Sequence, residues 1–416
     1  MDLYKRPLPP DKFEKDAQPH RDAVADLIKK LKKKPLKSAA QPKPAAKANK
    51  KAQKKNSKAK KDTIPFKDVW GNYKDHFAYA QFDKCGFCES DVKAAGHGDV
   101  EHYYPKGEVW ELTVKGRRRS KRVLSERGYW WKAYDWSNYL FACQKCNGSF
   151  KGSYFPVKET PRRLPPDHRP SKRFPTETPL LLNPYENIDP TKHLKFANQG
   201  LVLSLNASPF GEETIRTCGL NRPELIQARD AIYIRANELM SELSEATTKK
   251  ETLSALKKSY ALGRDDRPHS GMVRAIFKEF GVLWEDLVKK CASDFIAQLK
   301  AAKVTEAAQL EDFIEAMGRQ RYKHSEFVRK EYEATTGKSW DDLAGRCAGR
   351  LVKDILAAEK NQAIQAAELN FMYDKLYDMA RESPDYEATV IKAFESSTGM
   401  KWADLERKVQ KRPALR

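Results

Sequence analysis

The spacing of hydrophobic residues changes along the chain and predicts two kinds of structure. The apolar residues in LLLNPYENIDPTKHLKF and GLVLSLNAS indicate short strands that close a first domain. Pro223 suits the first turn of a helix, because no needed hydrogen bond is lost there, and that helix should run to about Ala246. The pattern beyond is helical throughout. A helix face leading into the first domain is predicted by Phe66, Trp70, Tyr73 and Phe77.

The helical part contains an internal repeat. Trp284, Trp340 and Trp402 each open a Trp-x-Asp-Leu motif. Before each motif a valine and an aromatic residue, four positions apart, are followed by a glycine that should end one helix. Three such units predict helices whose faces bury one another, with the Trp and Leu side chains in the core.

The N-terminal region has a different composition. Between Lys29 and Lys61 there are 15 lysines and no acidic residue, which contributes much of the formal net charge of +21. Such a stretch has too little apolar surface to fold and should attract polyanions such as nucleic acid; a solvated linker is the alternative. The chain is therefore expected to comprise a disordered lysine-rich arm, a first domain that contains the short strands and an α-helical repeat domain for binding or assembly, at residues 1–64, 65–222 and 223–416.

The composition indicates in which cellular environment the protein is expected. A charged fraction of 32% and the lack of an apolar run near the roughly 20 residues of a membrane span argue against a membrane protein. Since the N-terminus has no apolar stretch like a secretory signal, we expect a reducing, cytoplasmic location, where cysteines stay free or bind metal. Cys218, Cys291 and Cys347 stand singly and should pack as small apolar residues.

The other four cysteines form two CxxC pairs, at Cys85/Cys88 and Cys143/Cys146. Two such pairs can close a tetrahedral thiolate site, because each tight turn supplies two sulfurs. Four thiolates leave no open coordination position, so the expected Zn²⁺ is structural.

The segment between the pairs carries DVEHYYPKG. His102 is suited to take a proton from water, while Glu101 and Asn147 offer oxygen ligands for a catalytic Mg²⁺ or Mn²⁺. Asn138 could hydrogen-bond the backbone around the histidine. Lys151 lies four residues after Asn147 on the following helix, so it should face the same side and meet a phosphate.

A second group of cations lies at two apolar stretches that should form a hairpin or a loop with a basic tip. Because phosphate contacts come mainly from Arg and Lys, nucleic-acid binding is favoured over a solvated loop. These residues are Arg117, Arg118, Arg119, Lys121 and Arg122.

The ordered set CxxC, Glu-His, Asn, CxxC-Asn resembles the HNH endonuclease family, in a four-cysteine zinc variant. The resemblance implies a ββα-metal core in which His102 is the general base, Asn138 the middle asparagine, and Glu101 and Asn147 the metal ligands. Glu101 departs from the shorter aspartate more common at its position. Asp99 matches an additional acid that some members carry.

CGFCE, EHYYPKG, YWWKAYDWSNYLFACQKCNGSFKGSYFPV, LLLNPYENIDP and TIRTCGLNRPEL further resemble the HNH proteins of bacterial anti-phage operons. Those paired with an ABC-type ATPase in Septu-like and retron-linked systems are the most similar. The resemblance covers roughly residues 65–232, leaving out the lysine arm and the helical repeats.

We therefore expect an α+β protein: a zinc-stapled ββα-metal HNH domain followed by an all-α domain with three helical repeats. The predicted activity is metal-dependent hydrolysis of DNA phosphodiesters in a bacterial antiviral defence system, in an oligomer or a larger complex. Three alternatives stay open: an RNA-cleaving nuclease, a non-catalytic zinc-containing adaptor, and a nuclease subunit that is silent until it assembles with a partner ATPase.

Overall fold

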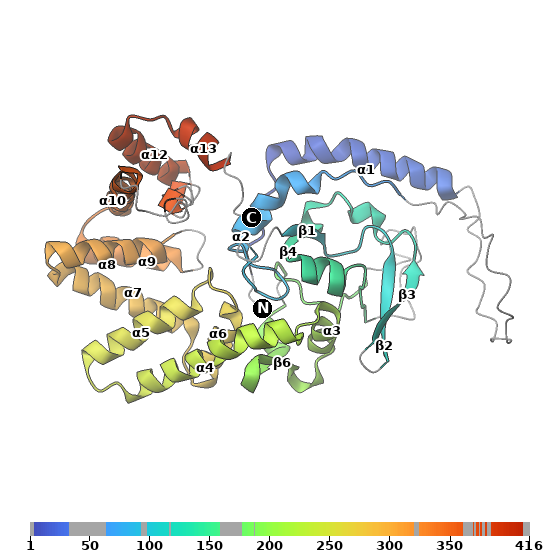
Figure 1. The fold of residues 1–416 in the computed structure, drawn as a ribbon, viewed down its shortest axis with the longest axis horizontal. Helices are drawn as coiled ribbons and strands as arrows, with labels where there is room; N and C mark the ends of the chain where they lie inside the picture. Colours follow the sequence, from blue (N-terminus) through green and yellow to red (C-terminus); the bar gives the residue numbers. More distant parts are fainter. Residues whose placement is uncertain are drawn as a thin grey trace. The chain divides into compact units, whose positions relative to one another are not determined.

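The computed structural model forms two compact units (Figure 1), one of Met1–Tyr233 with Asp266–Met272 and one of Ile234–Asp265 with Val273–Arg416. The structure describes residues 4–32, 64–92, 98–115, 118–158, 177–186, 188–319, 324–360, 369, 372–373, 375–376, 379–380 and 384–410. Arg117 and most of the lysine-rich stretch lie outside the described residues. Within the described part, none of the helices is both long and apolar enough to span a membrane.

Two short antiparallel strands form the centre of the first unit. Strand β1 (Asp99–His102) pairs with β4 (Tyr139–Ala142), with His102 opposite Tyr139 and Asp99 opposite Ala142. All four residues of β4 are buried, as expected for an apolar strand covered on both faces. The chain continues from β4 through the second CxxC pair into η4, a π-helical segment (Lys145–Lys151).

Two hairpins and two further helices belong to this unit, the second helix only as far as Tyr233. The predicted hairpin with basic residues is confirmed: β2 (Val109–Lys115) pairs with β3 (Arg118–Ser125). The strands expected before residue 208 are β5 (Leu194–Ala197) and β6 (Leu201–Ser204). Helix α3 (Pro209–Cys218) follows, and α4 (Pro223–Glu245) begins and ends close to the predicted residues.

The helix expected from Phe66 to Phe77 is shorter in the structure. A 3-10 turn, η1 (Trp70–Tyr73), leads directly into α2 (Lys74–Ala80). Phe66 precedes both elements and lies beside the cleft described below. The apolar spacing therefore predicted helical structure correctly for the residues nearest the first CxxC pair. The predicted helix began too far toward the N-terminus.

Helix α1 (Asp11–Lys32) corrects the prediction that all of residues 1–64 form an arm (Figure 1). Its apolar residues Phe13, Ala17, Val24 and Ile28 are buried, at the spacing of one helix face. The Phe13 ring packs edge-on against Trp136, with centroids 4.8 Å apart. An aromatic cluster in the first unit thus supplies the apolar partner that this helix needs.

The second unit is helical. Each Trp-x-Asp-Leu motif begins a helix, and the glycine before it has a positive φ (76° at Gly281, 68° at Gly337, 69° at Gly399), which ends the preceding helix. The motif leucines are fully buried. Besides the end of α4, the helices of this unit are α5 (Lys249–Gly263), α6 (Ser270–Glu279), α7 (Trp284–Ala301), α8 (Val304–Met317), α9 (Ser325–Thr336), α10 (Trp340–Lys360), α12 (Pro384–Thr398) and α13 (Trp402–Gln410).

The motif tryptophans pack on aromatic residues at close distance. Trp340 lies edge-on to Tyr332 and Trp402 edge-on to Phe394. The backbone N–H of Trp340 donates to a Glu333 carboxylate oxygen at 2.9 Å, which satisfies one open donor at the start of α10. Trp340 and Trp402 therefore lie in the core, as the sequence pattern predicts, whereas Trp284 is only half-buried.

Candidate functional site

The four cysteines of the two CxxC pairs come together in the first unit. Their sulfur atoms all lie within 4.8 Å of one another, and Cys88 Sγ is 3.9 Å from Cys143 Sγ. Cys85, Cys88 and Cys146 are buried, and Cys143 is half-buried. Four thiolates at this spacing fit a tetrahedral Zn²⁺ without an open position. The cluster predicted from the sequence is thus confirmed as a group that could hold a metal ion such as zinc.

Arg222 lies against this cluster and was not singled out from the sequence. Its guanidinium donates to Cys146 Sγ at 3.5 Å and to Cys88 Sγ at 3.6 Å. Burial disfavours the charged guanidinium, but the sulfurs of Cys146 and Cys88 outweigh burial and hold the pKa of Arg222 above its usual value. A cation beside the sulfurs suits a Zn²⁺ site with four thiolates, because that site carries a net negative charge. The signal in the sequence was only the position of Arg222 one residue before Pro223.

Gln81 connects the first cysteine pair to the central strands. Its side chain accepts from Phe141 N at 2.8 Å and donates to Phe141 O at 2.8 Å and to Lys84 O at 3.0 Å. Gly86 N, inside the first CxxC turn, also donates to Phe141 O at 2.9 Å. The cysteine cluster therefore holds β4 in place, and through the β4 pairing it holds β1.

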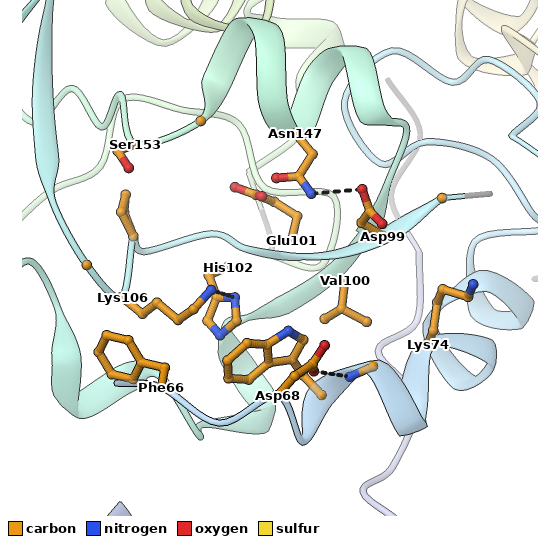
Figure 2. A pocket seen from close by; sticks show the side chains of 16 residues that line it. Phe66, Asp68, Lys74, Asp99, Val100, Glu101, His102, Lys106, Asn147 and Ser153 are labelled. Carbon is orange, nitrogen blue, oxygen red and sulfur yellow. Dashed lines mark hydrogen bonds between the residues drawn. The ribbon is translucent and has the colours of Figure 1, made fainter. Parts of the chain in front are cut away.

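A cleft of about 640 Å³ opens along β1 (Figure 2). Its walls come from the segment before α2, from β1 and the loop that follows, and from η4. Most of the catalytic residues predicted from the sequence line this one cleft. The polar side chains at its surface are Asp68, Lys74, Asp99, Glu101, His102, Lys106, Asn147 and Ser153.

Two residues of β1 face two residues of η4. Asn147 Nδ2 lies 3.4 Å from Asp99 Oδ2, and Lys151 Nζ donates to Glu101 Oε1. Side chains at i and i+2 of a strand share one face, and side chains four apart on a helical turn do the same. Two residues on one face of β1 thus lie opposite two residues on one side of η4. Figure 2 shows the Asn147 amide oxygen on the side of Glu101.

Lys151 corrects one prediction. It was expected to meet a phosphate, but its side chain is fully buried. Besides Glu101, its ammonium donates to His102 O at 3.0 Å and to Gly152 O at 3.2 Å. An ammonium has three N–H donors, and these three acceptors occupy them. Its place on the same side as Asn147 was predicted correctly, and the partner there is Glu101.

Glu101 is buried beside this lysine. Burial raises the pKa of Glu101, and the positive charge of Lys151 acts in the opposite direction. Asp99, Glu101 and Asn147 together place carboxylate and amide oxygens at one edge of the cleft, which is the ligand type that Mg²⁺ and Mn²⁺ prefer. The residues therefore fit the predicted cation in chemistry. These three are the residues that would hold it.

His102 is held by its Nε2 atom. That nitrogen lies 3.0 Å from Ala133 O, and because a carbonyl oxygen only accepts, Nε2 carries the proton. The ring is packed edge-on between Trp70 and Tyr139, at centroid distances of 4.5 and 5.0 Å. Burial, followed by the charge of Lys106, lowers the pKa of His102 well below its usual value. The imidazole is thus neutral near pH 7, with its Nδ1 lone pair directed at the cleft.

Asn138 makes the contacts expected of a positioning residue. Its Oδ1 accepts from Tyr104 N at 2.7 Å, and its Nδ2 donates to Tyr104 O at 3.0 Å and Lys132 O at 2.9 Å. Its own carbonyl accepts from Tyr103 N at 2.9 Å. These bonds connect the loop after His102 to the segment that contains Ala133. They therefore hold the His102 side chain and its partner Ala133 O in position relative to each other.

The basic hairpin lies apart from these residues. Lys121 Nζ lies 3.7 Å from the centre of the Trp110 ring, and Arg122 Nε donates to Glu111 at 2.7 Å. Both side chains are exposed. Arg118 and Arg119 are placed in β3, and Arg117 falls outside the described residues. The hairpin does not line the cleft, so its predicted contact with nucleic acid stays a prediction.

Comparison with known proteins gives one informative relative. The chain is 36% identical over 146 residues to the Septu protein PtuB of Bacillus mycoides (strain KBAB4). The aligned part covers 35% of this chain and 45% of that relative, so less than half of the relative is represented. No protein-family model and no solved structure matches the chain. The similarity supports the Septu part of the resemblance seen in the sequence.

Proposed function

We propose that this protein is a metal-dependent HNH-type endonuclease that hydrolyses DNA phosphodiester bonds. The observation that carries the proposal is the position of His102: its Nε2 is bound to Ala133 O, so its Nδ1 carries the lone pair, and the residue lines a cleft with Asp99, Glu101 and Asn147 at the edge. A neutral imidazole held in one tautomer suits a general base. The carboxylates beside it are suited to a cation.

The residues have separate roles in this reaction. His102 Nδ1 takes a proton from the attacking water, and Asn138 keeps the surrounding loop in position. Lys151 holds Glu101 at the cleft, while Asn147 is directed between the two acids. A divalent cation on Asp99, Glu101 and Asn147 would neutralise charge on the phosphate and on the departing oxygen.

The similarity to a Septu protein supports a role in bacterial anti-phage defence. A single site of this kind cuts one strand at a time, so a double-strand break requires two copies or a larger complex. Assembly with a partner ATPase is an alternative form of the proposal: the sequence has no GxxxxGK[ST] motif, so any ATP dependence would come from another subunit. In that form the nuclease is silent until the complex assembles.

The test is cleavage of plasmid DNA and of RNA by the wild type and His102→Ala, with Mg²⁺, with Mn²⁺ and with EDTA. We expect metal-dependent DNA cleavage that falls about 10²- to 10⁴-fold in the variant. His193→Ala is the matched control, because His193 contacts Ser208 and does not line the cleft. Equal cleavage by His102→Ala and the wild type would refute the assignment, and cleavage of RNA alone would select the alternative substrate.

A further inference from the structure

Lys106 contacts His102 Nδ1, the atom that the proposed reaction requires as the proton acceptor. Its Nζ lies 3.2 Å from His102 Nδ1 and 4.3 Å from the centre of the Trp70 ring (Figure 2). His102 Nε2 is already bound to Ala133 O, so Nδ1 is the ring nitrogen with a lone pair. An ammonium only donates hydrogen bonds. The Lys106 N–H therefore points at the lone pair that would accept a proton from water.

This contact blocks the base. A lone pair that accepts from Lys106 cannot accept from a water molecule at the same time. The nucleophile and the base must lie within hydrogen-bond distance for proton transfer. Lys106 consequently has to leave Nδ1 before His102 can act.

The surroundings of Lys106 indicate what could draw it away. Among the described residues, its ammonium has an imidazole and an aromatic face as partners, and no carboxylate within ion-pair distance. Burial lowers the pKa of Lys106, and the charges of Glu101 and Asp68 act in the opposite direction. An anionic oxygen is a stronger acceptor for an ammonium than a neutral imidazole. Lys106 lines the same cleft as the candidate metal ligands, where a phosphate would enter.

We propose that Lys106 is a phosphate-operated latch on His102, an inference that rests on the proposed function. In the free protein Lys106 covers Nδ1. When a DNA phosphate enters the cleft, Lys106 transfers to a phosphate oxygen, and the vacated Nδ1 becomes accessible to water. The base is thus exposed only when a phosphodiester is present. Lys106 becomes a substrate-binding residue in the same movement.

The first test observes Nδ1 directly. The protein is labelled with ¹⁵N-histidine, and the His102 resonances are assigned among the eight histidines by their absence from His102→Ala. A short DNA duplex is titrated in without any added divalent cation, so that no cleavage occurs. We expect the Nδ1 resonance to move, on adding DNA, to the position that Lys106→Met shows without DNA. A resonance that keeps its free position at saturating DNA would overturn the latch.

The second test measures binding. We expect Lys106→Met to bind the duplex about tenfold more weakly than the wild type, because a hydrogen bond to a charged group is lost. Lys106→Arg should retain most of the affinity. Lys74→Met is the matched control: Lys74 lines the same cleft and has no contact with His102, so its loss should leave the Nδ1 resonance unchanged. Unchanged affinity in Lys106→Met would contradict transfer of Lys106 to the phosphate.

The two proposals can fail separately. Neither measurement needs catalysis, and the DNA titration itself is carried out on the wild type. If DNA moves the Nδ1 resonance but His102→Ala cleaves as well as the wild type, the phosphate-dependent movement of Lys106 stands and the assignment of His102 as the general base falls. If His102→Ala is inactive but DNA leaves the resonance in place, the nuclease stands and the latch falls.

Discussion

The cysteine cluster and the cleft both take residues from η4, but they are held in different ways. In the cluster, four identical groups meet one another within 4.8 Å. In the cleft, groups of different charge each depend on a partner from elsewhere in the chain: Glu101 on Lys151, and His102 on Ala133 O. A metal ion would hold the cluster together, whereas the cleft depends on individual buried contacts.

The largest effect should come from the cluster. Cys146→Ser removes one thiolate from a site whose metal contributes on the order of 10 kcal/mol to folding in small zinc modules. Because the first CxxC turn is hydrogen-bonded to Phe141, loss of the metal should also loosen β4 and β1. We expect loss of bound zinc and of the cooperative unfolding transition of the first unit.

Zinc content and thermal unfolding measure this outcome. Cys291→Ser is the control, since Cys291 is a buried single cysteine of the second unit and belongs to no cluster. A Cys146→Ser protein with full zinc content and wild-type stability would show that the cluster is not a metal site.

The next largest effect should come from Lys151→Met. This change leaves Glu101 charged, buried and without its partner, which costs about 3–5 kcal/mol of unfolding free energy for a buried ion pair. The loss should be smaller in Mg²⁺ or Mn²⁺ if a cation binds at Glu101, because a ligand of the folded state stabilises it. Urea unfolding with and without the cation measures both effects.

The double variant Glu101→Gln/Lys151→Met separates charge from packing. It removes both charges, so its stability should lie above that of Lys151→Met alone. A double variant that is no more stable than Lys151→Met would show that the unpaired charge of Glu101 does not cause the loss, which leaves the lost bonds to the backbone of His102 and Gly152 as its cause.

Asn138→Ala should have an intermediate effect. It removes three hydrogen bonds to buried backbone and leaves Tyr104 N without its acceptor, at a cost of about 3 kcal/mol. The variant should keep its zinc but lose cleavage, because the loop that follows His102 is no longer tied to residue 132. Zinc content together with cleavage rate measures this separation, and wild-type cleavage by a destabilised variant would remove Asn138 from the positioning role.

The comparison also explains what the sequence could predict. The cysteine spacing sufficed for the cluster, since two tight turns leave their sulfurs few other arrangements. The helix from Pro223 was likewise predictable from its first turn. The burial of the Lys151 side chain could not be predicted. The spacing indicates which residues share a face, but it does not indicate which group on that face accepts a hydrogen bond from the ammonium. Helix α1 was missed because its apolar stripe is covered by aromatic residues far away in the sequence. The Lys106 contact depends on the conformation of the loop after β1.

Arg222 is an exception to this contrast between the cluster and the cleft, because here the cysteine cluster also has a partner from elsewhere in the chain. Arg222→Met removes the cation and its hydrogen bonds to Cys146 and Cys88 while retaining much of the buried volume. Residues that support metal ligands in this way typically contribute 10- to 100-fold in metal affinity. We therefore expect faster zinc release to a chelator, with the fold preserved when zinc is bound. Arg229→Met is a control for a buried arginine on the helix that follows Arg222, since its guanidinium donates to Leu220 O and Leu225 O and to no cysteine sulfur in the described contacts. If both variants release zinc at the wild-type rate, the four sulfurs suffice, and the contrast between a self-contained cluster and a partner-dependent cleft holds without exception.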